Sequence, residues 1–237
     1  MKSQLYLWSK LREKLVAEIE LFRDTYAERV QPVFANVEEE ADKIQENYYN
    51  QFMSTSVEDY NCIDPGDIAD SALQLGLDYY EKYSLMRYNN LAMWIAMLYQ
   101  YWEQQVRLFL FNEERHTFEI NFKDFCSKGI AQIIEEFRFH KINLEDLKCW
   151  EDINILRLVC NTLKHGDGGA AQKLKQIEPK FFIREGLKDY DLLAVYKSTL
   201  LYEVLNISDE DFRKFCNSLI EFWRELPESM YSDEIIE

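Results

Sequence analysis

Three side chains with the chemistry of phosphate cleavage follow one another at four-residue intervals: Arg157, Asn161 and His165. On an α-helix, residues four apart are surface neighbours, so the three would share one face, spread over about 80° and about 12 Å of the axis. Arginine can bind a phosphate through two parallel N–H groups, histidine can exchange a proton near neutral pH, and an amide can orient either group. The trio is therefore a candidate catalytic set for phosphodiester cleavage without a metal ion.

The same residues also have a structural interpretation. Arg157 can pair with a nearby carboxylate, and Asn161 can bond to the backbone. His165 and the neighbouring Lys164 can cap the carbonyl end of a helix, where positive charge is favourable. The apolar residues of the segment fall on the opposite side: Leu156, Val159, Cys160 and Leu163. We therefore expect the trio to line a groove or an interface and not the centre of a core.

Two predicted helices position these side chains. The first opens at Asn143-Leu-Glu-Asp and ends at Gly166, since glycine commonly terminates helices. The second is a central helix from Pro65 to about Glu114. It begins with Asp64 as the cap, followed by proline in the first turn.

Glu103, Gln104 and Gln105 form a polar triplet inside the apolar part of the central helix. Polar groups in such a place need hydrogen-bond partners. Glu103 is expected either to support the site, by pairing with Arg157 or orienting His165, or to belong to a hydrogen-bond network between packed helices. Both interpretations predict contact with the helix that carries the trio.

Apolar residues recur at helical intervals in most other long segments, which predicts an all-α fold. The further expected helices are 4–53 with a kink at Pro32, 121–139, 170–177 and 212–226, the last preceded by the capping residue Ser208. The segment 192–204 has a β-branched and aromatic pattern that predicts a small two-stranded element. We expect a single helical domain over 1–237, an antiparallel bundle with long N-terminal and central helices. A core bundle, 1–178, would carry a C-terminal extension, 179–237, packed on it.

Composition limits the function. A formal charge of −16 disfavours an extended nucleic-acid surface, but screening over about 8–10 Å leaves room for a local cationic site that binds RNA. The five cysteines lack Cys-x-x-Cys spacing, which favours free thiols in a reducing compartment. The chain shows neither a signal peptide nor an apolar run of about 20 residues, so we expect a cytoplasmic protein with no membrane contact.

The stretch Arg157 to Gly169 resembles the carboxy-terminal motif of HEPN-family proteins, helical domains that carry Arg-x(4–6)-His. Asn89 to Leu110 resembles the central helix of such domains, where a glutamate lies among apolar residues. Together the two matches cover about 89–169. Arg157 and His165 are separated by seven residues, one more than the motif has, and Leu158 stands where the family commonly has a polar residue.

The resemblance implies a metal-independent endoribonuclease of a bacterial defence or toxin type that needs no cofactor. It implies a homodimer in which Arg157 and His165 of two chains face each other across a cleft. His165 would act on the attacking 2′-hydroxyl or the leaving oxygen, and Arg157 would stabilise the phosphorane. Asn161 would orient both groups, with Glu103 and Lys164 in support.

Two alternatives from other classes remain open. All-α nucleoside triphosphate pyrophosphatases hold Mg²⁺ between acidic pairs on adjacent helices, and Glu39 and Asp42 lie in a carboxylate-rich helical segment that could supply one such pair. The other alternative is a non-enzymatic interaction module. It would use the aromatic groups Tyr48-Tyr49, Tyr79-Tyr80 and Tyr99–Trp102.

Overall fold

The computed structural model describes residues 2–54, 64–127, 129–186 and 190–232. Its elements in chain order are β1 (Gln4–Tyr6), α1 (Ser9–Thr25), a π-helical turn (Tyr26–Val30), a 3₁₀ turn (Gln31–Phe34), α2 (Val37–Ser54), α3 (Pro65–Glu114), α4 (Phe122–Ser127), α5 (Ile130–Phe139), a 3₁₀ turn (Leu144–Asp146), α6 (Trp150–His165), α7 (Gly169–Ile177), a 3₁₀ turn (Pro179–Phe182), α8 (Leu192–Tyr196), α9 (Asp209–Glu225) and β2 (Ser229–Tyr231). The predicted all-α class is confirmed. Within the described ranges, no helix is long and apolar enough to cross a membrane.

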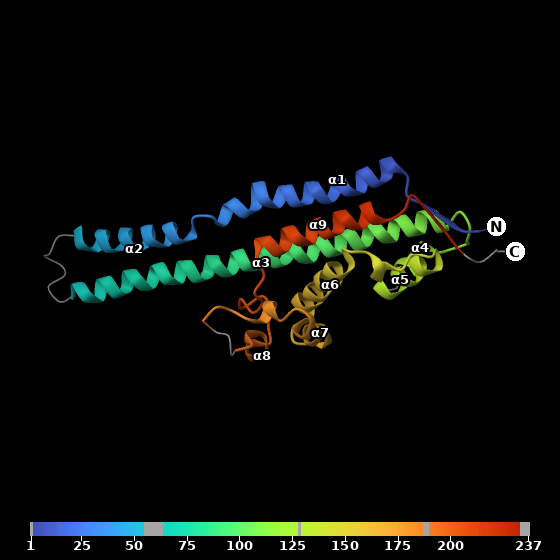
Figure 1. Ribbon diagram of the computed structural model, residues 1–237. Helices are drawn as coiled ribbons and strands as arrows, with labels where there is room; N and C mark the ends of the chain where they lie inside the picture. Colours follow the sequence, from blue (N-terminus) through green and yellow to red (C-terminus); the bar gives the residue numbers. More distant parts are fainter. Residues whose placement is uncertain (1, 55–63, 128, 187–189, 233–237) are drawn as a thin grey trace.

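α3 is a central helix that runs along most of the length of the molecule (Figure 1). The Asp64 carboxylate caps it by accepting a backbone N–H at 2.8 Å, and Pro65 occupies the first turn, where no N–H is needed. Its 50 residues span about 75 Å. Gly76 lies within it because a Cβ there would come 3.2 Å from the backbone oxygen of Ala41 on α2. The predicted central helix is confirmed with its predicted bounds.

The N-terminal helical segment is interrupted at Pro32, as predicted. Proline has no N–H to continue a helix, and the chain passes through a π-helical and a 3₁₀ turn between α1 and α2. The first helix begins at Ser9 and not at the predicted residue 4, which belongs to β1. α1 packs along α9, whereas α2 pairs with the N-terminal part of α3 (Figure 1). We call α2 together with residues 65–87 of α3 the arm, because this helical hairpin projects from the body.

A pair of short strands joins the two ends of the described chain. β1 and β2 are antiparallel, with Leu5 opposite Met230 and both side chains buried. The predicted two-stranded element is therefore present, but its predicted place at 192–204 was wrong. That segment contains α8, which Asp191 caps by accepting a backbone N–H at 3.1 Å. Val195 there is 62% exposed, so its β-branched side chain lacks the half-buried surface that favours a strand.

α9 lies between α1 and α3 and also contacts α6 (Figure 1). A capping box starts it, in which Ser208 Oγ accepts from Asp211 N at 3.2 Å and the Asp211 carboxylate accepts from Ser208 N at 2.9 Å. Trp223 of α9 is fully buried and donates its indole N–H to Gln105 Oε1 at 3.3 Å. The residues of the predicted extension, 179–237, therefore include a helix of the hydrophobic core.

Glu114, buried at the C-terminal end of α3, lies near the half-buried Glu136 of α5. α4 and α5 divide the single helix predicted for 121–139. Glu114 is 3% exposed, and its Oε1 has no hydrogen-bond partner in the described residues. Burial, and after it the carboxylate of Glu136, raise the pKa of Glu114 to about 9. Gln132 Nε2 donates to Glu136 Oε1 at 3.0 Å, so Glu136 has a hydrogen-bond partner of its own.

Glu114→Gln is expected to remove a loss of stability at high pH. Glutamate titrates near 4.5 in the unfolded chain and Glu114 near 9 in the folded protein, so the folded state holds the extra proton between these values and loses stability as pH rises through them. The neutral amide cannot titrate. The difference in free energy of unfolding, variant minus wild type, should therefore rise by about 1 kcal/mol or more from about pH 5 to pH 9. Urea denaturation across this range measures the difference, and a constant difference would contradict a protonated Glu114 in the folded state.

Candidate functional site

α6 carries the three predicted catalytic side chains. After the 3₁₀ turn at Leu144–Asp146, the helix begins at Trp150, later than the predicted opening at Asn143. It ends at Gly166, as predicted, where φ is +68° and the backbone N–H bonds to Thr162 O at 2.8 Å. Its apolar side packs against α3, α7 and α9. This packing leaves the opposite, polar side of α6 toward solvent.

The trio lies along that polar side with increasing exposure toward the C-terminus. Arg157 and Asn161 are half-buried, whereas Lys164 and His165 are exposed. The His165 side chain makes no hydrogen bond or ion pair with any residue that the structure describes. It stands free at the carbonyl end of the helix, where a positive charge is favourable.

The Arg157 guanidinium is held by an amide. Its Nε and Nη2 both donate to Asn154 Oδ1, at 3.3 and 2.8 Å. Helical side chains lean toward the N-terminus, and this contact to a residue three positions earlier directs the guanidinium away from His165. Among the described residues no carboxylate forms an ion pair with Arg157. In one chain, therefore, the arginine and the histidine do not converge on a single point.

Glu103 is paired within its own helix. Its Oε1 accepts from Arg107 Nη2 at 3.3 Å and from the Tyr99 hydroxyl at 3.4 Å, and the expected ion pair with Arg157 does not form. Sequence reasoning missed Arg107, although its spacing of four residues from Glu103 is a known signal for such a pair. Arg107 is 4% exposed, so this ion pair is largely withdrawn from water.

Charged side chains of the two helices nevertheless lie near one another. The pKa of Tyr99 is raised by burial and by Glu103, while the positive charge of Arg157 on α6 acts in the opposite direction. The thiol of Cys160 is likewise affected by Lys164 and by Glu103: burial raises its pKa most, and Lys164 lowers it. We call Tyr99, Glu103 and Arg107 of α3 with Arg157, Asn161, Lys164 and His165 of α6 the α3–α6 patch.

The rest of the polar triplet faces elsewhere. Gln105 is 8% exposed and donates through Nε2 to Glu18 Oε2 of α1 at 2.8 Å, while its Oε1 accepts the Trp223 indole N–H. Its amide therefore links three packed helices. Gln105 therefore belongs to a hydrogen-bond network between packed helices, but its partners lie on α1 and α9 and not on α6, where contact was predicted.

The residues of the metal-dependent alternative lie on the arm. Glu39 is exposed and pairs with Lys43 one turn later, which lowers the pKa of its carboxyl. Asp42 is also exposed. The nearby Glu40 accepts the Tyr79 hydroxyl at 2.6 Å. In the parts of the chain that the structure describes, no group of three or more His, Cys, Asp or Glu side chains is placed to hold a metal ion.

Comparison with protein-family models, with curated proteins and with solved structures found no match to this chain.

Gly166→Ala should destabilise the end of α6 that presents His165. At φ +68° an L-residue is strained, and the new Cβ would also lie 3.3 Å from Lys197 O. We expect a loss of about 1–3 kcal/mol in the free energy of unfolding. Gly169→Ala is the matched control, because no atom lies within 4 Å of its added Cβ and alanine favours the first turn of α7. Urea denaturation measures both variants. Equal losses of stability would contradict the strain expected for alanine at Gly166, where α6 ends.

Proposed function

We propose that the α3–α6 patch is an RNA phosphodiester site and that the protein is a metal-independent endoribonuclease acting as a homodimer. One observation carries the proposal. Arg157, Lys164 and His165 occupy the polar side of α6 without a carboxylate ion pair among the described residues, in a chain of formal charge −16. Two unneutralised cations, Arg157 and Lys164, beside a histidine on one helix of an acidic protein favour an anionic ligand.

The available groups match the chemistry of RNA cleavage. Arg157 can exchange the neutral Asn154 oxygen for phosphate oxygens, to which its N–H groups bind more strongly because both partners are charged. His165 is exposed and unpaired, so its ring can reach a 2′-hydroxyl or a leaving oxygen as general base or acid. Asn161 lies between the two on the same side of α6.

A second copy of the chain would bring an arginine and a histidine together. Eight residues of helix place Arg157 and His165 about 12 Å apart along the axis, and the guanidinium leans further away. A two-fold axis passing near Asn161, perpendicular to α6, brings Arg157 of one chain opposite the His165 of the other. Two equivalent composite sites then form in a closed dimer.

His165→Ala is expected to lower the rate of RNA cleavage by about 100-fold or more, because a positioned general acid or base contributes about that much. Cleavage of a single-stranded RNA by the wild type should persist in EDTA. His116→Ala is the matched control, since His116 is an exposed histidine outside the patch and its variant should cleave at the wild-type rate. Cleavage that needs Mg²⁺, equal rates in the two histidine variants, or no cleavage would overturn the proposal.

Mixing of inactive variants tests the composite site. Arg157→Ala and His165→Ala chains should each be inactive alone. A heterodimer of the two retains one intact site of two, so an equilibrated equimolar mixture should recover about a quarter of the wild-type rate. If the mixture contains correctly folded dimers and stays inactive, Arg157 and His165 of the same chain act together, and the two-chain geometry is contradicted.

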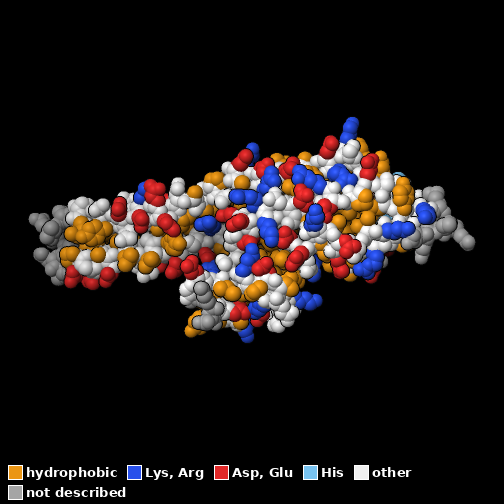
Figure 2. All heavy atoms as spheres, in the orientation of Figure 1, with side chains coloured by type: hydrophobic (Ala, Val, Ile, Leu, Met, Phe, Trp, Pro, Cys, Tyr) orange, Lys and Arg blue, Asp and Glu red, His pale blue; other side chains and the backbone are white. Residues whose placement is uncertain are grey.

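A second candidate function, an interaction module, is favoured by the arm. Leu73, Leu77 and Tyr80 are each 40–46% exposed and follow one another at helical spacing along α3, whereas Tyr99 and Trp102 in the body are buried. The arm holds nine acidic and three basic residues. Figure 2 shows hydrophobic side chains on the arm bordered by carboxylates. This combination fits a basic amphipathic helix of a partner protein. The negative charge of the arm disfavours its pairing with the arm of a second copy.

An amphipathic Leu/Lys helical peptide is the probe for this surface. The double substitution Leu73→Ser and Leu77→Ser should weaken its binding by about 10-fold, because two leucines lose apolar contact area. Leu21→Ser, at an exposed leucine of α1, is the control and should bind as the wild type does. Fluorescence anisotropy measures the affinity, and equal affinities for all three proteins would exclude the arm as the docking surface.

A further inference from the structure

An apolar pocket lies beside the α3–α6 patch, where α3, the end of α6 and the loop after α8 meet. Its volume is about 330 Å³, within the range of about 300–1,000 Å³ that small-molecule sites occupy. The two helices supply an apolar wall of Ala92, Met93, Ala96 and Leu163, and the loop supplies Ser198, Thr199 and Leu200. Lys164, a member of the α3–α6 patch, completes the lining. The pocket and the patch are therefore continuous.

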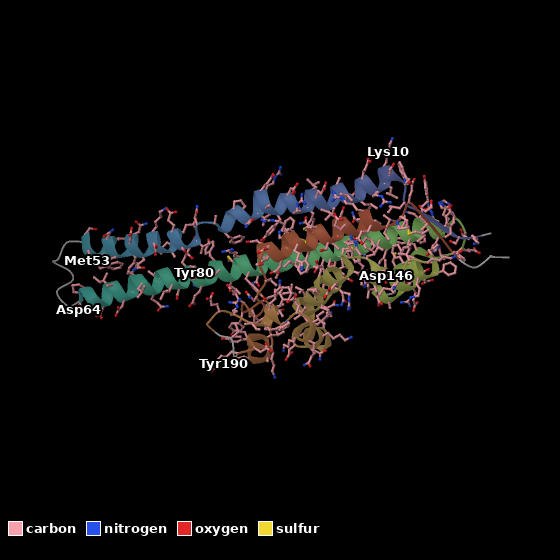
Figure 3. The ribbon with its side chains drawn as sticks, viewed as in Figure 1. Lys10, Met53, Asp64, Tyr80, Asp146 and Tyr190 are labelled. Atoms are coloured by element: carbon pink, nitrogen blue, oxygen red, sulfur yellow. The ribbon has the colours of Figure 1, made fainter. Side chains whose placement is uncertain are left out.

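Two hydrogen bonds hold the loop of this pocket in place. Thr199 Oγ1 donates to Leu163 O at 2.6 Å, which satisfies a carbonyl group at the end of α6. Asn89 Nδ2 of α3 donates to Leu200 O at 2.8 Å. Figure 3 labels Tyr190, near the start of the segment that leads through α8 to this loop. The pocket is thus already formed in the single chain.

The charges around the pocket are positive. Among the residues that the structure describes, no carboxylate lines it, although the chain has 43 acidic residues. Glu103, the carboxylate of the patch, lies about 10 Å beyond Ala96 along the α3 axis and is paired with Arg107. Lys197, which is exposed, adds a second cation to the loop. The pocket therefore offers apolar surface next to positive charge on an acidic molecule.

A nucleobase joined to a phosphate has the complementary properties. The faces of a base are apolar, and Met93, which is 58% exposed, carries a flexible thioether that contacts aromatic rings favourably. The half-buried Ser198 hydroxyl forms no hydrogen bond with another described residue, so it can donate to or accept from the edge of a base. The Lys164 ammonium can bind the adjoining phosphate.

We propose that this pocket binds the base of the nucleotide next to the phosphodiester bond that is cleaved. The inference rests on the proposed ribonuclease function, because that function places the RNA backbone along α6. His165 follows Lys164 in the chain, so a base held beside Lys164 brings its phosphate close to the histidine. The pocket contributes affinity for the nucleotide, and the groups of the patch perform the cleavage.

Adenosine 5′-monophosphate and ribose 5-phosphate are the probes, each titrated into the full-length protein by calorimetry. The two share a sugar and a phosphate and differ in the base. The wild type should bind the nucleotide about 10-fold more tightly, a factor that requires about 55 Å² of apolar surface to leave water. Equal affinities, or no saturable binding of the nucleotide, would overturn the proposal.

This measurement does not depend on cleavage, so the two proposals can fail separately. Equal affinities together with RNA cleavage in EDTA would reject the base pocket and leave the ribonuclease. Tighter binding of the nucleotide without any cleavage would support the pocket and reject the ribonuclease.

Met93→Ser should reduce the preference for the nucleotide by about 3-fold, because one apolar wall of the pocket is lost, and leave the affinity for ribose 5-phosphate unchanged. Met86→Ser is the matched control. Met86 lies seven residues earlier on the same side of α3, is 56% exposed and does not line the pocket, so its variant should keep the wild-type preference. Thermal denaturation shows whether both variants are folded. A folded Met93→Ser protein with the wild-type preference would contradict the base pocket.

Discussion

The packing of α9 between α1 and the C-terminal half of α3 is the contact on which the other parts of the molecule depend. Trp102 and Trp223 are fully buried there, and Phe222 meets Trp102 edge-on with ring centroids 5.0 Å apart. Burial of large aromatic side chains is the strongest apolar contribution that single residues make to a core. Without α9, Gln105 would also lose its indole donor.

α3 has different surroundings at its two ends, and this difference separates the candidate functional surfaces. In the body, α1, α6 and α9 cover α3, so α6 must turn its apolar side inward and its polar side, with Arg157 and His165, outward. In the arm α2 covers α3, which leaves Leu73 and Leu77 in water. A polar cavity of about 450 Å³ lies at the junction, where residues of the arm and of the body line it together.

Features that depend on neighbouring residues could be predicted from the sequence. The cap at Asp64, the capping box at Ser208 and the stop at Gly166 follow from local hydrogen bonding and backbone conformation, and the structure has all three. Features that depend on distant residues could not. The pairing of β1 with β2 joins residues more than 220 positions apart, and no local pattern around Leu5 distinguishes it from the start of a helix.

For the candidate site, the sequence by itself determined that Arg157, Asn161 and His165 share one side of a helix, because helical period is a local property. Only the tertiary structure decided that this side is open to solvent and that Arg157 of α6 forms no ion pair with Glu103 of α3. These outcomes depend on which helix covers which face of α3. Burial is set by contacts between segments that are far apart in the chain.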